Sequence, residues 1–116
     1  MQALTLMNDR AYVEAALGLA RRALTERAAA SDDAARVQYM FRLATARRPR
    51  DVEARHLQQV VARERRRLAA DPAAAAALVA QAAAIGGHAD TDPVEFGAWF
   101  CVATVLLNLD EVITKG

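Results

Sequence analysis

The chain has 116 residues and a formal net charge of +1, and this length fits one domain with a buried core. Hydrophobic residues make up 54% of it but aromatic residues only 5%, so few side chains could stack on bases or planar ligands. Residues 1–71 hold 14 Arg against 9 acids, whereas residues 72–116 hold one Lys and 5 acids. We expect the two halves to neutralise each other within the fold; the alternative is that they steer an oppositely charged partner.

Strong start and stop signals divide the first half of the chain into helices. Asn8 is a good N-cap for a helix that runs to about Arg27, in a stretch whose Ala and Arg favour helix. A second helix is predicted to begin at Ser31-Asp32-Asp33 and to stop at Pro49. Its inward face is expected to carry Val37, Met40, Phe41 and Ala44.

Asp51 is predicted to cap a third helix, whose buried stripe consists of Leu57, Val60, Val61 and Leu68. Glu64 falls inside that stripe, next to arginines at positions 63 and 65–67. We expect Glu64 to be a residue paired with one of these arginines, or one at the rim of the stripe, rather than a catalytic acid. Because no aromatic residue is interleaved with the arginines, the cluster predicts a solvated helix face and no nucleic-acid partner.

Two further helices complete the chain. Pro72 occupies a typical first helical position, and an alanine-rich helix is predicted from there to Ile85, where Gly86-Gly87 ends it. The last helix is capped by Asp92, with Glu95 closing a capping box, and is expected to continue to Ile113. Because no charge occurs from Phe96 to Leu109, this helix should lie in the centre of the core, although it is too short to span a bilayer.

Together these signals predict one all-α domain over residues 1–116. It is a bundle of about five helices with short loops and a central apolar C-terminal helix. Short connections favour antiparallel neighbours, so an up-and-down arrangement is expected.

The sequence assigns no catalytic, cofactor-binding or metal-binding residue. Cys101 is the single cysteine and is expected to behave as a small hydrophobe in the last helix, far in sequence from His56 and His88. His88, Asp90 and Asp92 form only a weak metal-like pattern, which we interpret as a loop followed by a helix cap. No phosphate loop, zinc-finger spacing or nucleophile elbow is found.

Several short segments carry a family pattern: Gln2-Ala3-Leu4-Thr5-Leu6-Met7-Asn8-Asp9, Val13-Glu14-Ala15-Ala16, Phe41-Arg42-Leu43, Arg48-Pro49, Ala98-Trp99 and Leu106-Leu107-Asn108-Leu109-Asp110-Glu111-Val112-Ile113. With them the chain closely resembles the C-terminal domain, of unknown function, of large exported planctomycete proteins (the planctomycete PSD-one family). Many of those proteins carry cytochrome c modules nearer the N-terminus. The resemblance spans nearly the whole chain, and its most specific piece is the closing Leu-Asn-x-x-Glu, although Val112 stands where the family more often has Phe.

The resemblance implies that the chain is the C-terminal part of a longer protein, so that Met1 is not a natural domain start. It also implies export of that parent protein to the periplasm or cell surface. The first thirty residues of this chain do not have the pattern of a signal peptide, so from its own sequence we expect only a soluble polypeptide of unassigned location.

Four residues are candidates for an interface with other domains of the parent: Asn8, Trp99, Asn108 and Glu111. Each also has a purely structural interpretation. Asn8 would cap the first helix, Trp99 would fill the core, Asn108 would satisfy backbone groups at the end of the last helix, and Glu111 would pair with an arginine. In the interface hypothesis, Asn108 and Glu111 share one helical face because they are three residues apart.

Three functions are compatible with these observations. The first is a non-catalytic helical module that packs against the rest of the parent, in which case the isolated chain should expose apolar surface and self-associate. The second is a contribution to an enzyme active site of the parent, in redox or polysaccharide chemistry, with Glu111 or Glu64 as acid or base. The third is a free-standing helix-repeat scaffold, since residues 44–57 look superficially like part of a tetratricopeptide unit.

Overall fold

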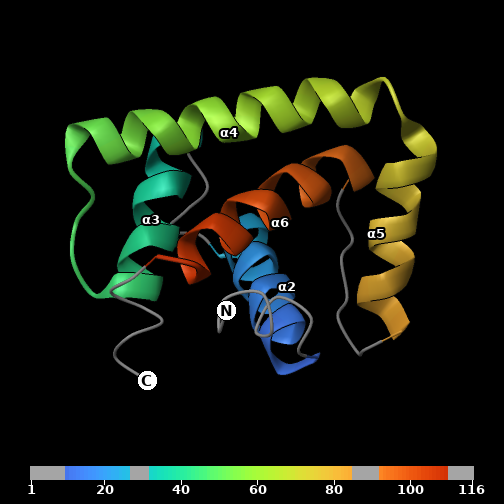
Figure 1. Ribbon diagram of the computed structural model, residues 1–116, viewed down its shortest axis with the longest axis horizontal. Coiled ribbons are helices and arrows are strands. Elements are labelled where there is room, and N and C mark those ends of the chain that lie inside the picture. Colours follow the sequence, from blue (N-terminus) through green and yellow to red (C-terminus); the bar gives the residue numbers. More distant parts are fainter. Residues whose placement is uncertain (1–9, 27–31, 85–91, 110–116) are drawn as a thin grey trace.

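The computed structural model describes residues 10–26, 32–84 and 92–109. Five helices lie within these ranges: α2 (Arg10–Thr25), α3 (Asp33–Thr45), α4 (Asp51–Ala69), α5 (Pro72–Ala84) and α6 (Pro93–Leu107) (Figure 1). The described residues contain no strand, and the predicted all-α class is confirmed. None of the described helices has both the length and the apolar character that crossing a membrane requires.

Helix α6 lies in the middle of the molecule, as its uncharged sequence predicted. It packs against α4, α2 and α5 more extensively than those helices pack against one another. Phe96, Trp99, Val102 and Leu106 are buried on one side of this helix, and Gly97 and Ala98 are buried on the other. A helix that is apolar on all sides avoids water only if other helices surround it.

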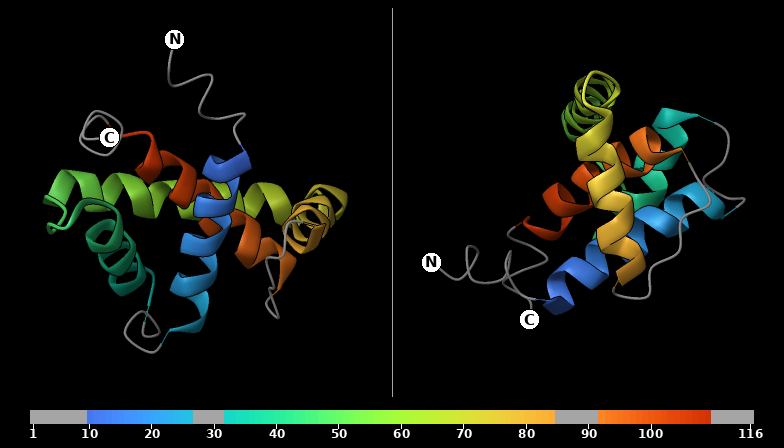
Figure 2. Two further views of the ribbon diagram at one scale, coloured as in Figure 1. Left: turned by 90° about the horizontal axis from the view of Figure 1, so that it is seen from below. Right: turned by 90° about the vertical axis from the view of Figure 1, so that its right-hand side faces the viewer.

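The helices are not arranged up and down, and this prediction is wrong. In Figure 1, α4 lies across the ends of α3 and α5, and in the right-hand view of Figure 2 it is seen nearly end-on beside an upright α5. The short connections change the chain direction instead of reversing it. Asp71 precedes Pro72, whose ring disfavours a helical backbone at the residue before it, so α5 cannot continue α4.

The caps of two helices agree with prediction. The Asp32 carboxylate accepts a hydrogen bond from Ala35 N at 2.8 Å at the start of α3, and Asp92 accepts one from Val94 N at 2.8 Å at the start of α6. Each cap satisfies one of the amide groups that a helix N-terminus leaves without an internal partner. Asn8 and residues 85–91, on which the other predicted helix boundaries fall, lie outside the described residues.

Two predicted boundaries around the connection between α3 and α4 are wrong. Helix α3 ends at Thr45, before Pro49 could stop it, because Ala46 adopts a left-handed backbone with φ 65°. Asp51 is the first residue of α4 and not its cap. The N-cap is Arg50, whose backbone N–H donates to the Glu53 carboxylate at 2.7 Å.

The same carboxylate binds Arg47 through both of its oxygens, at 3.0 and 2.9 Å. The Arg47 guanidinium also lies over the Phe41 ring, 4.7 Å from its centroid. The hydrogen bonds from Arg47 and then from the Arg50 backbone lower the pKa of Glu53 from 4.5 to about 2. Glu53 thus ties the end of α3 to the start of α4 in its charged form.

We expect this contact to give the protein an acid-sensitive stability. Because the pKa of Glu53 is lower in the folded than in the unfolded chain, its contribution is complete above about pH 4.5 and is lost as the pH falls towards 2. Urea midpoints measured from pH 6 to pH 2 should therefore fall less steeply for Glu53→Gln than for the wild type. Arg47→Met should flatten the curve in the same way, and parallel curves for all three proteins would contradict the assignment.

The two glycines in described helices have opposite surroundings. A Cβ added to Gly97 in α6 would lie 2.5 Å from Leu68 Cδ1 and 3.1 Å from Leu78 Cδ1, so the glycine lets α6 approach α4 and α5 closely. Leu68 is fully buried and has little room to move. A Cβ added to Gly18 in α2 would meet no described atom within 4 Å.

The same substitution should therefore change stability in opposite directions at these two positions. Gly18→Ala should raise the free energy of unfolding by about 0.5–1 kcal/mol, the usual gain for Gly→Ala within a helix. Gly97→Ala should lower it, because overpacking costs about 1–3 kcal/mol and outweighs that gain. Urea denaturation of both variants measures the two changes. If Gly97→Ala stabilised the fold, the Leu68 side chain would have to move aside to accept the added Cβ.

Candidate functional site

Two of the four predicted interface residues, Asn8 and Glu111, lie outside the described residues. The other two are on α6 or at its end, and the structure places both. Their role at an interface stays a prediction, because it concerns contacts with another part of a larger protein.

Trp99 is fully buried in the core. The Arg36 guanidinium lies 5.4 Å from the centroid of its ring, and Arg36 Nε donates to the Ala23 carbonyl at 3.0 Å. Arg36 thus joins α2, α3 and α6 by a cation–π contact and a hydrogen bond. The indole N–H has no hydrogen-bond partner among the described residues. Within this chain Trp99 contributes through packing.

Asn108 is the C-cap of α6, so it does not lie inside a longer helix as predicted. Glu111, with which it was expected to share a helical face, lies outside the described residues. The side-chain amide donates to the Thr104 carbonyl at 2.8 Å and to Tyr12 Oη at 2.5 Å, and Tyr12 Oη donates to the same carbonyl at 2.9 Å. Burial raises the pKa of Tyr12. Asn108 therefore satisfies backbone groups, as its structural interpretation expects, and ties α6 to the start of α2.

The Glu64 carboxylate on α4 is paired, as predicted. It accepts hydrogen bonds from Arg67 at 2.8 Å and from the Cys101 thiol at 3.5 Å. Burial raises the pKa of Glu64, but the hydrogen bonds from Arg67 and Cys101 outweigh it and leave the pKa below its ordinary value. Burial, and then the negative charge of Glu64, raise the pKa of Cys101 to about 11. Near neutral pH this geometry holds a carboxylate and a protonated thiol, which suit neither a general acid nor a nucleophile.

Arg65 is the charged residue whose role the sequence reasoning missed. It does not belong to the solvated cluster, because its guanidinium binds Glu95 at the start of α6 at 2.5 and 2.9 Å and Asp33 at the start of α3 at 3.0 and 3.2 Å. Hydrogen bonds to Glu95 and then Asp33 raise the pKa of Arg65. Glu95 consequently faces Arg65, and the predicted capping box with Asp92 does not form.

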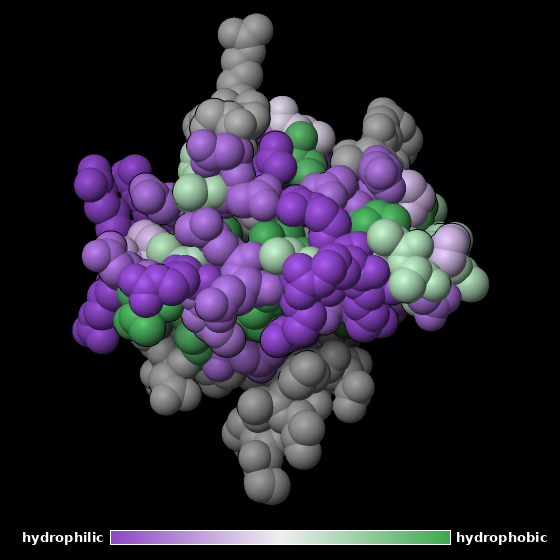
Figure 3. Space-filling view, turned by 90° about the horizontal axis from the view of Figure 1, so that it is seen from above, coloured by the Kyte–Doolittle hydropathy of each residue, from purple (hydrophilic) through white to green (hydrophobic). Residues whose placement is uncertain are grey.

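A sequence signal for this contact existed. Arg65 follows Val61 by four residues and precedes Leu68 by three, so helical spacing places it beside the buried stripe of α4. Arg63, Arg66 and Arg67 are exposed, and Figure 3 shows hydrophilic side chains across this side of the molecule. For those three residues the predicted solvated face is confirmed.

Replacing Arg65 should destabilise the fold. Arg65→Met leaves two partly buried carboxylates without their partner, which should cost about 1–2 kcal/mol, between the values for exposed and for buried ion pairs. Arg66→Met, one residue along the same helix, is the matched control and should change the free energy of unfolding by less than about 0.5 kcal/mol. Equal urea midpoints for the two variants would contradict a structural role for Arg65.

The described ranges contain no group of three or more His, Cys, Asp or Glu side chains that could hold a metal ion. Of the weak metal-like pattern, His88 and Asp90 fall outside these ranges, while Asp92 caps α6.

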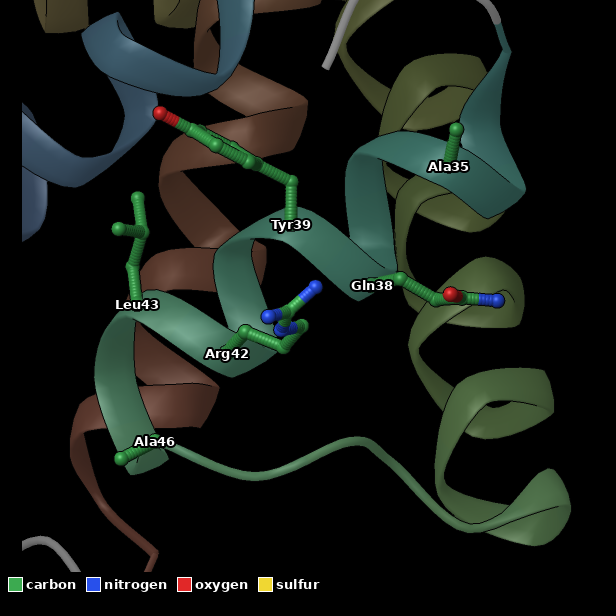
Figure 4. Close-up of a pocket in the computed structure, with 6 residues that line it drawn as sticks. All are labelled: Ala35, Gln38, Tyr39, Arg42, Leu43 and Ala46. Carbon is green, nitrogen blue, oxygen red and sulfur yellow. The ribbon is translucent and has the colours of Figure 1, made fainter. Parts of the chain in front are cut away.

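An open groove runs along α3 to α2 and the end of α6. It consists of a hollow of about 520 Å³ along α3 and a hollow of about 320 Å³ between α2, α3 and the end of α6, and Leu43 lines both. Leu19 from α2 and Leu107 from α6 contribute further apolar surface, and Gly18 leaves the α2 backbone open to it. Figure 4 shows Tyr39 and Leu43 pointing towards the side on which α2 lies. We call this site the α2/α3 groove.

Arginines surround the apolar part of the α2/α3 groove. Arg42 lines one hollow and Arg21 and Arg22 line the other, and all three are exposed. Arg22 pairs with Glu26 at 3.1 Å, whereas neither Arg21 nor Arg42 forms an ion pair with a described residue. The groove therefore combines exposed apolar surface with positive charge. Sequence patterns did not reveal it, because it depends on how α2 and α3 are placed relative to each other.

Fold and site together define a small all-helical domain with an open, positively charged groove. Over residues 1–61 the chain matches the model of the family PSD1, described as "Protein of unknown function (DUF1553)". This is more than half of its length, and the chain belongs to that family. The matched residues include both helices that form the walls of the groove. No curated protein and no solved structure matches the chain.

Proposed function

We propose that this chain is a non-catalytic helical module that packs through the α2/α3 groove against another region of a larger protein. That protein is proposed to be exported, of the planctomycete type, and to carry cytochrome c modules. One observation supports the packing role most directly: Leu43 is 38% exposed at the centre of a groove that other half-buried apolar side chains line. A partner that covers these side chains removes their apolar surface from water, which favours association.

The family match supports the same proposal. The matched segment ends within α4, yet it contains all of α2 and α3 and hence both walls of the groove. The remaining apolar surface of α6 is largely covered by the other helices. The groove is therefore a place where a neighbouring region could cover apolar side chains of three helices.

The enzyme alternative has weaker support. The Glu64 carboxylate accepts hydrogen bonds from Arg67 and Cys101, which lower its pKa and weaken it both as an acid near neutral pH and as a base. Glu111 lies outside the described residues. A helix-repeat scaffold would stack similar helix pairs, whereas here the helices surround the single central helix α6. We therefore rank both alternatives below the packing module.

Hydrogen exchange tests the packing role. We expect the backbone amides of residues 18–22 and 39–46 to exchange more slowly in the longer protein than in this chain alone, because the neighbouring region covers them there. In the longer protein, Leu43→Glu should lower the thermal midpoint by several degrees but should change that of the isolated chain little.

Val52→Glu is the matched control, because Val52 is the other exposed large hydrophobic residue of the described ranges, 64% exposed, and does not line the groove. It should leave both proteins unchanged. Unaltered exchange in the longer protein would contradict the proposal. Loss of an activity of the longer protein in Glu64→Gln, with stability retained, would favour the enzyme alternative.

A further inference from the structure

We infer that the occupant of the α2/α3 groove is a helix of the larger protein with leucine-sized side chains on one face and acidic side chains along its flanks. The inference rests on the proposed function and specifies the chemistry of the partner. It follows from three features of the groove: an unexplained glycine, a leucine-lined floor and exposed arginines.

Gly18 is not explained by the packing of this chain. It lies within α2, where glycine is about 0.5–1 kcal/mol less favourable than alanine. Nothing described within 4 Å of its added Cβ requires the smaller residue. An occupant that approaches the α2 backbone closely would require it, as Leu68 and Leu78 do at Gly97.

The floor of the groove suits a helix. Leu19, Leu43 and Leu107 come from three different helices and are each partly exposed, so they form an apolar surface between two walls. Ala15 and Gly18 lie three residues apart on the α2 wall, where their small size leaves the helix backbone accessible. A helix can place side chains spaced by three and four residues into such a surface while its backbone approaches the small residues.

The charges select acidic flanks. An occupant without charge would leave Arg21 and Arg42 unpaired beside a surface that it removes from water, which costs free energy. A second copy bound through the same groove would bring the two sets of arginines together and is disfavoured by repulsion. A second copy that placed its α5 in the groove would bring no charged side chain to pair with Arg21 and Arg42. An occupant with acidic side chains beside an apolar face would pair with the arginines and also cover the leucines.

A pair of synthetic peptides tests the inference on the isolated chain. The first is a blocked, fluorescein-labelled 18-residue helix with Leu at three- and four-residue spacing and Glu on both flanks. The second has Lys in place of each Glu. We expect fluorescence anisotropy to show binding of the Glu peptide at least about 10-fold tighter than that of the Lys peptide, with a preference that shrinks as salt is added.

Variants locate the binding. Gly18→Leu should fill the groove and weaken binding of the Glu peptide at least about 10-fold without lowering the thermal midpoint, because the added side chain meets no described atom at its Cβ. Arg21→Glu combined with Arg42→Glu should reverse the preference between the two peptides. Arg66→Glu, an exposed arginine of α4 outside the groove, is the control and should leave the ratio of affinities nearly unchanged.

Four outcomes would overturn the inference. Equal binding of the two peptides, or binding that Gly18→Leu leaves intact, would show that the groove does not select an acidic helix. Self-association of the chain in light scattering that Gly18→Leu abolishes would make a second copy the occupant. Displacement of the Glu peptide by decanoate at equal concentration would indicate a fatty-acid site. If the groove is protected in the longer protein but shows no charge preference, the packing role stands and the acidic helix does not.

Discussion

The fold depends on the need to keep α6 out of water on every side. Phe96, Trp99, Val102 and Leu106 are all fully or almost fully buried on one side of the helix, and Gly97 and Ala98 are buried on the other. At about 1.5–3 kcal/mol for each large apolar side chain, exposing one face of α6 would cost much of the stability of a small domain. Helices α2, α4 and α5 are therefore arranged around α6, and α4 crosses the others because that position covers a side that antiparallel neighbours would leave open.

Local chemistry made the elements predictable. Caps such as Asp32, the position of Pro72 and the buried stripes of α3 and α4 are all set by residues within one or two helical turns. Chain direction was not predictable in this way, because the crosswise path of α4 depends on which face of α6 lacks a cover. The boundaries at Thr45 and Arg50 failed for a related reason. A left-handed alanine and a carboxylate that binds Arg47 decide them, and neither belongs to a usual helix signal.

Very little of the candidate site could be predicted. Asn108 was singled out by the family pattern and Trp99 as a core residue that could also anchor an interface, and in the structure both make contacts within this chain. The α2/α3 groove combines residues of three helices, none of which looks unusual in its own sequence. Gly18 was a local signal, because glycine is unfavourable within a helix and so indicates a special role. That role depends on the open space around its added Cβ, which the sequence does not reveal. Arg65 shows the same limit, because its two partners are 30 and 32 residues away.

The hydrogen bond between Tyr12 and the Thr104 carbonyl joins residues 92 positions apart, and Asn108 reinforces it from the end of α6. On a ribosome, α2 is made first, yet the helix that covers it and fixes its tyrosine is made last. The earlier helices must therefore wait with their apolar faces uncovered until α6 has emerged, a period of seconds at ordinary rates of synthesis. Release or stalling before residue 93 would leave a chain that lacks α6, and the apolar faces that α6 covers would then be exposed to aggregation.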